Sequence, residues 1–191
     1  LPKMEFPGGL LIGDNAGTGN DGTGQGNYSV AIGTNAGAEN QSQYSVAIGN
    51  NAGRQNSQGL ASVAVGNIAG RNNQGATAVA IGNSSGSTNQ SQYGIAIGND
   101  AGTENQGNSS VAIGYNAGKY EQGTYAVAIG QGAGEGPDNV GQGNYAIGIG
   151  YRAGYQSQHA NSIVLNASGS ALNSGGTSRF FVKPIRSSTN S

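Results

Sequence analysis

The sequence has no cysteine and no tryptophan, it has only three phenylalanines, and charged residues make up 9% of its 191 positions. The lack of cysteine excludes disulfide scaffolds and thiolate metal sites. The sequence has few large apolar side chains and 37 glycines. This composition argues against the filled core of a compact enzyme domain. The net charge is −1 and the basic residues are scattered, so we expect no nucleic-acid partner.

Residues for catalysis and metal binding are also scarce. His159 is the only histidine, so one chain cannot build a Ser-His-Asp triad or a histidine-based zinc site. The four residues Glu39, Glu104, Glu121 and Glu135 have no consistent spacing, whereas a sugar-cleaving enzyme needs paired carboxylates. We therefore expect no enzyme activity, no cofactor and no metal. No apolar run approaches the roughly 20 residues of a membrane span, so we expect no membrane insertion.

What the sequence does contain is a short repeat. The phrase SVAIGTNAG at 29–37 returns as SVAIGNNAG, SVAVGNIAG and SVAIGYNAG. The first apolar residue of each copy recurs mostly every 16 residues, at Leu10, Val30, Val46, Val63, Val79, Ile95, Val111, Val127, Ile147 and Ile163. The intervals that end at Val30 and Ile147 are 20 residues long, and we interpret the additions as loops.

The pattern inside each repeat is that of a β-strand. A 16-residue period is too short for a pair of helices, and apolar residues alternate with small ones. In residues 28–32, Tyr28, Val30 and Ile32 share one face, and Ser29 and Ala31 share the other. The Gly and Asn residues that follow suit left-handed turns. The sequence predicts an all-β fold, a parallel β-roll or β-solenoid of nine or ten coils.

A glutamine stands five residues before nearly every strand. The set is Gln25, Gln41, Gln58, Gln74, Gln90, Gln106, Gln122, Gln142 and Gln158. Coils stacked in register place each of these side chains above its copy, so the amides can form a ladder along the axis. We interpret this row as structural.

The middle residue of each strand is uniformly small. The row consists of Ala31, Ala47, Ala64, Ala80, Ala96, Ala112, Ala128 and Gly148. Small residues let another backbone approach closely, so we expect this face to pack neighbouring copies of the chain. The alternative is a thin single-chain solenoid whose interior is the small face.

Three segments and two loops follow from this register. We expect an extended segment at 1–9, the β-roll repeat domain at 10–167 and an extended connector at 168–191. Because the chain begins Leu-Pro-Lys rather than with Met, we expect a piece or processed product of something longer. Binding residues often lie on loops held by a rigid scaffold, so the candidate recognition residues are Asn20, Asp21, Asp138 and Asn139 in the two insertions.

A set of tyrosines recurs two residues before the strand anchor: Tyr28, Tyr44, Tyr93, Tyr125 and Tyr145. These residues lie on the Val/Ile side of the strand. Two interpretations remain open, namely packing at a rim with the hydroxyl in water, or a stripe on which sugar rings stack.

The repeated SVAIG phrase, over about residues 10–167, resembles the head repeat of YadA-type trimeric autotransporter adhesins. That resemblance implies a parallel β-roll in which three chains stand side by side. The 16-residue form with AG and QG, followed by NSIVLNASGSALNSGGTSRFFVKPIR at 161–186, is similar to fibre proteins of tailed phages and of large algal or amoebal viruses.

The resemblance implies a structural fibre or adhesin segment that attaches to a host or surface, outside the cell, on a virion or cell-surface fibre. Its partners would be copies of itself and a glycan or protein receptor. One alternative is an extracellular filament subunit that polymerises end to end through its apolar termini. Another is an ice-binding solenoid, although no threonine ladder occupies a fixed repeat position.

Overall fold

The computed structural model describes residues 9–18, 25–137 and 140–185. Within these ranges the chain forms fourteen β-strands and no helix. Eleven strands form sheet A: β1 (Leu10–Ile12), β2 (Val30–Ile32), β3 (Val46–Ile48), β5 (Val63–Val65), β7 (Val79–Ile81), β9 (Ile95–Ile97), β10 (Val111–Ile113), β11 (Val127–Ile129), β12 (Ile147–Gly150), β13 (Ile163–Asn166) and β14 (Phe180–Lys183). Three form sheet B: β4 (Gln55–Gln58), β6 (Asn72–Gln74) and β8 (Thr88–Gln90).

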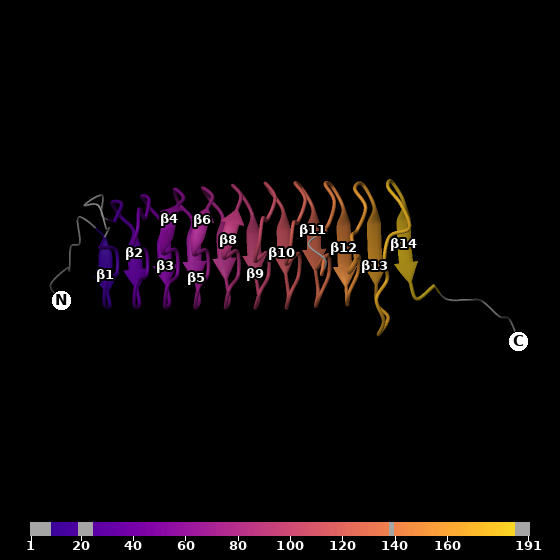
Figure 1. The fold of residues 1–191 in the computed structure, drawn as a ribbon, viewed down its shortest axis with the longest axis horizontal. Coiled ribbons are helices and arrows are strands. Elements are labelled where there is room, and N and C mark those ends of the chain that lie inside the picture. The colour runs from indigo at the N-terminus through magenta and orange to yellow at the C-terminus, as the bar shows by residue number, and fades with distance from the viewer. Residues whose placement is uncertain (1–8, 19–24, 138–139, 186–191) are drawn as a thin grey trace, which may run out of the picture.

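The strands of sheet A are stacked in parallel along one axis. They lie side by side in chain order from β1 to β14 (Figure 1). Equivalent repeat positions pair with each other, as in Val79 with Ile95, Ala80 with Ala96 and Ile81 with Ile97. The predicted all-β parallel solenoid with a 16-residue step is therefore confirmed. At about 4.8 Å per strand, the ten steps of sheet A span about 48 Å.

The stack continues past residue 167, where the sequence predicted an extended connector. Strand β14 pairs in parallel with β13, with Ile163 opposite Phe180 and Leu165 opposite Val182. The interval from Ile163 to Phe180 is 17 residues, close to the repeat. The chain between these strands thus makes one more coil without the repeated phrase, which the sequence pattern did not reveal.

The small residues lie inside the coil. Ala31, Ala47, Ala64, Ala80, Ala96, Ala112 and Ala128 are 0% exposed in the single chain, and Gly148 is buried as well. The expectation that this row contacts neighbouring copies is therefore corrected: one chain already covers it. The alternative that the sequence left open, a thin solenoid with the small face inside, describes the structure.

The reason is the width of the coil. The alanine of each strand faces a second buried row after the turn, which includes Ala52, Ala69, Ala101, Ala117 and Ala133. Neighbouring rows approach so closely that a Cβ added to Gly102 would lie 3.2 Å from the Ala96 Cβ. In most coils this space holds only alanine or glycine, and alternation along the strand sends Val and Ile outward. An exception is β13, in which Val164 takes the inner position and is 0% exposed.

A glycine follows sheet A in most coils and allows them to stack closely. Gly98 has φ of 127°, and a Cβ built there would lie 2.7 Å from the carbonyl oxygen of Gly114 in the next coil. A side chain at this position would therefore clash with backbone in an unfavourable conformation. Left-handed conformations also recur at Asn residues, such as Asn35 and Asn51, as the sequence predicted for the turns.

Candidate functional site

The outer face of sheet A carries two continuous rows of apolar side chains, which we call the Val/Ile face. It consists of Val30, Ile32, Val46, Ile48, Val63, Val65, Val79, Ile81, Ile95, Ile97, Val111, Ile113, Val127, Ile129, Ile147, Ile149, Ile163 and Leu165. All of these side chains are partly exposed, and Ile81 and Ile149 reach 38% and 39%. A contiguous apolar surface of this length is rare on a soluble monomer and marks an interaction site.

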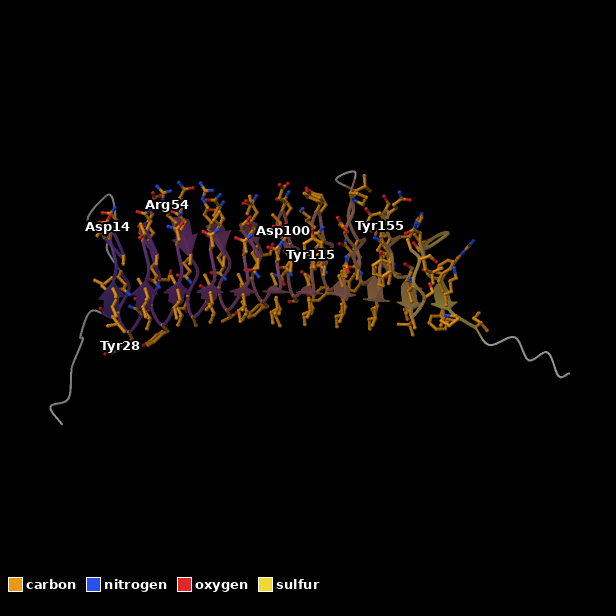
Figure 2. The ribbon with its side chains drawn as sticks, turned by 90° about the horizontal axis from the view of Figure 1, so that it is seen from below. Asp14, Tyr28, Arg54, Asp100, Tyr115 and Tyr155 are labelled. Atoms are coloured by element: carbon orange, nitrogen blue, oxygen red, sulfur yellow. The ribbon has the colours of Figure 1, made fainter. Side chains whose placement is uncertain are left out.

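Charged residues avoid the part of the coil that carries the Val/Ile face. From four residues before each anchor to three after it, none of the ten repeat coils contains Asp, Glu, Lys or Arg, as 91–98 and 107–114 illustrate. The charges of these repeat coils, among the described residues, fall in the other half: Asp14, Glu39, Arg54, Arg71, Asp100, Glu104, Lys119, Glu121, Glu135 and Arg152. The last coil is the exception, with Arg179 before β14 and Lys183 in it. In Figure 2, Arg54 lies away from the side of sheet A on which Tyr28 lies. The coil therefore has an uncharged apolar side and a charged polar side.

Tyrosines border the Val/Ile face at the start of the strands. Tyr28 and Tyr44 stack with ring centroids 5.6 Å apart, and Tyr125 and Tyr145 stack at 5.2 Å. Tyr28, the most exposed of them, has 68% of its surface accessible. Stacked rings beside an apolar face fit the interpretation of rim packing, because their apolar bodies extend the face and their hydroxyls reach water.

The glutamine row lies in the interior, opposite the alanines. Gln90 is 1% exposed, and its amide nitrogen donates to the Val79 carbonyl at 2.8 Å and to the Gly94 carbonyl at 3.1 Å. The predicted ladder is confirmed at four steps: Gln74 to Gln90, Gln106 to Gln122, Gln122 to Gln142 and Gln142 to Gln158, with N to O distances of 3.0 to 3.2 Å.

The ladder is not continuous. Among the described residues, the buried side-chain oxygens of Gln41, Gln58, Gln74 and Gln106 accept no hydrogen bond, and neither amide atom of Gln25 has a partner. The amide nitrogens of Gln41, Gln58, Gln74 and Gln106 nevertheless donate to strand carbonyls, as Gln41 donates to the Val30 carbonyl at 2.9 Å. The glutamine row therefore stabilises the individual coils more consistently than it links one coil to the next. Both contributions agree with a structural role.

Polar ladders run along the charged side. Asn67 donates to Asn83 at 2.8 Å and Asn83 to Asn99 at 3.0 Å. A second ladder connects Asn73, Asn89 and Asn105, with distances of 2.9 Å between successive amides. These contacts are exposed, so each adds little stability, but together they fix the register of the turns.

The coils near the C-terminal end are different on this side. Lys119 lies 3.7 Å from Asp100, and its ammonium lies 5.2 Å from the ring centroid of Tyr120. Partial burial lowers the pKa of Lys119, but the hydrogen bond with Tyr120 and the nearby Asp100 carboxylate outweigh it and raise the pKa above its usual value. Two coils later, Arg152 lies between two tyrosine rings.

The four predicted recognition residues cannot be placed on this surface. Asn20, Asp21, Asp138 and Asn139 lie outside the described residues. Within the described ranges, no group of three or more His, Asp or Glu residues gathers as a metal site does, and no helix is long and apolar enough to cross a membrane. His159 is exposed, and its Nδ1 lies 2.9 Å from the Ser174 hydroxyl.

The sequence did not predict that the Val/Ile face is the exposed side of the strands. The alternation was read correctly, but it does not say which side of a strand is inside. A signal was nevertheless present, because charged residues are absent from eight successive positions in each of the ten repeat coils. A contiguous apolar side without charge is typical of interaction surfaces.

The comparisons with known proteins identify no relative. No family model matches the chain, no curated protein matches it, and no solved structure matches it.

Proposed function

We propose that this chain is a structural segment of a fibre or adhesin, in which copies of the chain pack through their Val/Ile faces into a stiff homotrimeric β-roll used for attachment to a host or surface. The observation that carries the proposal is the uncharged apolar face along sheet A. The number three and the attachment role come from the resemblance to YadA-type heads and viral fibre proteins. The extracellular location, on a virion or cell-surface fibre, belongs to the same proposal.

The size of the face supports association. A face about 48 Å long and about 15 Å wide offers about 700 Å² per copy, near the roughly 800 Å² per partner of a standard interface. Two rows of β-branched side chains on a regular pleat present a smooth surface that a second copy matches row for row. Burial of this surface compensates for a coil interior that holds little more than alanine and glutamine.

A filament subunit is a second candidate, and the ends of sheet A favour it. In the described part of the chain, β14 has no neighbour on its outer edge, and Phe180 is 61% exposed. An unpaired strand edge can accept another strand, so rods could join end to end. The ice-binding alternative has less support, because the outward rows hold Val and Ile rather than Thr.

Electron microscopy of the purified chain separates these functions. The proposed fibre segment predicts isolated rods about 5 nm long, made of three chains. Long filaments that lengthen with concentration would support the filament subunit instead. Rods of single chains that slow the growth of ice crystals would support the ice-binding role and contradict the proposal. The attachment role itself is tested by the sugar-binding experiment of the next subsection.

A further inference from the structure

One edge of the rod changes its chemistry toward the C-terminal end. The position four residues after the strand anchor lies where sheet A strands lead into the turn, and it holds Asn67, Asn83 and Asn99 in consecutive coils. In the coil of β10 the same position holds Tyr115, and in the coil of β12 it holds Tyr151. Tyr115 is 52% exposed, so its ring does not fill the coil. Asparagine at this position bonds to its copy in the next coil. The stacking of coils therefore does not explain why tyrosine replaces it.

Arg152 is fixed beside these tyrosines. Its guanidinium carbon lies 4.7 Å from the ring centroid of Tyr155 and 5.4 Å from that of Tyr151. Two cation–π contacts hold the planar group in one orientation and leave its N–H donors for other oxygens. No ion pair joins Arg152 to another residue in the described part of the chain, whereas Lys119 is paired with Asp100.

The remaining groups on this edge are hydrogen-bonding and planar. Gln131 is exposed and lies between Tyr115 and Tyr151 in the same row, since the Gly132 amide binds the Tyr115 carbonyl and the Arg152 amide binds the Gln131 carbonyl, both at 2.8 Å. In the turns of the same coils, Glu135 accepts a hydrogen bond from Asn116 at 3.0 Å. Figure 2 shows Tyr115 and Tyr155 on the same stretch of the rod.

We infer that Tyr115, Gln131, Tyr151, Arg152 and Tyr155 form a binding edge for an oligosaccharide of pyranose rings. The electron-rich faces of the tyrosine rings attract the C–H groups of a sugar ring, while Arg152 and Gln131 donate to its oxygens. Tyr115 and Tyr151 are two coils apart, about 10 Å, so the edge fits an extended sugar chain rather than a single ring. This inference rests on the proposed attachment function, for which it names the receptor class.

The chemistry of the edge favours a sugar over the other ligands of a fibre. A peptide would require apolar pockets or a strand edge, whereas this edge has one exposed ring, Tyr115, and two partly exposed rings, Tyr151 and Tyr155, with polar groups beside them. A phosphate chain would require several cations, and Arg152 is the one cation of the set. Carboxylate and hydroxyl oxygens both suit a guanidinium, so acidic and neutral sugars share the site chemistry.

The test is a titration of the purified chain with tetragalacturonate and with the uncharged galactotetraose, followed by NMR signals of the tyrosine rings. We expect ring signals of Tyr115 and Tyr151 to shift with one or both sugars. Arg152→Gln and Tyr115→Ala should each weaken binding about tenfold. The acidic sugar binding alone would identify a carboxylate as the partner of Arg152, and equal binding would identify hydroxyl groups.

The matched control is Tyr44→Ala, which removes an equally exposed ring from the other end of the strands and should leave binding unchanged. Light scattering of every variant reports assembly separately, so a failed sugar site is distinguishable from a failed oligomer. No shift with either sugar, or unchanged affinity in Arg152→Gln and Tyr115→Ala, would overturn the inference. Loss of the oligomer in Tyr115→Ala would also overturn it, because the edge would then be an interface between chains.

Discussion

At the scale of the residue, glutamine is the largest side chain that the interior accepts. Gln90 fills the space that the alanines leave, and its amide satisfies strand and turn carbonyls that point into the coil. An apolar side chain of similar volume would remove both hydrogen bonds, each of which contributes about 0.5 to 1.5 kcal/mol to the net stability. The glutamine row therefore replaces the hydrophobic core of an ordinary domain.

Replacing Gln90 by Ala should lower the free energy of unfolding by about 2 to 4 kcal/mol, because it opens a cavity and removes two hydrogen bonds to carbonyls. Thermal unfolding followed by circular dichroism measures this loss. Gln92→Ala in the same coil is the control, since Gln92 is exposed. Equal effects of the two substitutions would contradict the assigned role of the buried row.

The glycine after each strand is a second position at which one residue decides the stack. Gly98→Ala should destabilise the protein by more than about 2 kcal/mol, because the new Cβ would meet the Gly114 carbonyl oxygen and φ of 127° is unfavourable for alanine. Denaturant titration gives the value. Gly169→Ala is the comparison, as a Cβ there has no atom within 4 Å. A neutral effect at Gly98 would mean that the coils are less closely stacked than described.

At the scale of the element, each strand of sheet A separates small residues from large ones across one pleat. Ala96 points into the coil, and its neighbours Ile95 and Ile97 point out. The alanine therefore sets the thickness of the coil, and the two isoleucines form its outer face.

Ala96→Leu should prevent the coil from closing, because the interior has no room for three more carbon atoms. We expect loss of the β-sheet circular dichroism signal or a fall of the melting temperature by tens of degrees. Ile97→Leu, which adds no volume, should leave the spectrum unchanged. A folded but monomeric Ala96→Leu protein would contradict this expectation and would indicate that the small face joins chains.

The sequence predicted the repeat strands of sheet A, their period and the glutamine row, because each depends on local spacing and repeats many times. It did not predict sheet B, whose polar strands have no alternation of apolar and small residues. It did not predict which side of the strand is buried, since alternation in a segment such as 28–32 is symmetric with respect to inside and outside. Nor did it predict β14, because pairing through Phe180 depends on the shape of the preceding coil rather than on a repeated phrase. Nor did the sequence predict the proposed binding edge, because its residues come from different coils.

At the scale of the whole molecule, charge is sorted by side rather than by position along the rod. In the ten repeat coils the side of sheet A is uncharged, and Lys, Arg, Asp and Glu lie in the other half of the coil. The last coil departs from this pattern, because Arg179 precedes β14 and Lys183 lies in it. In the proposed assembly, this arrangement would place the charged side toward water and the apolar side against other copies. It also means that association should depend little on salt concentration, because ion pairs have no part in the interface.

The central claim is that the Val/Ile face joins copies of the chain, and molar mass in solution by light scattering tests it most directly. The wild-type protein should have three times the chain mass of 18.9 kDa at micromolar concentration. Ile97→Lys should yield a monomer with the wild-type circular dichroism spectrum, because a charge buried in an apolar interface lacks a partner. Asn99→Lys, two residues away at the exposed turn, should remain a trimer. A wild-type monomer, or an Ile97→Lys protein of unchanged mass, would contradict the account.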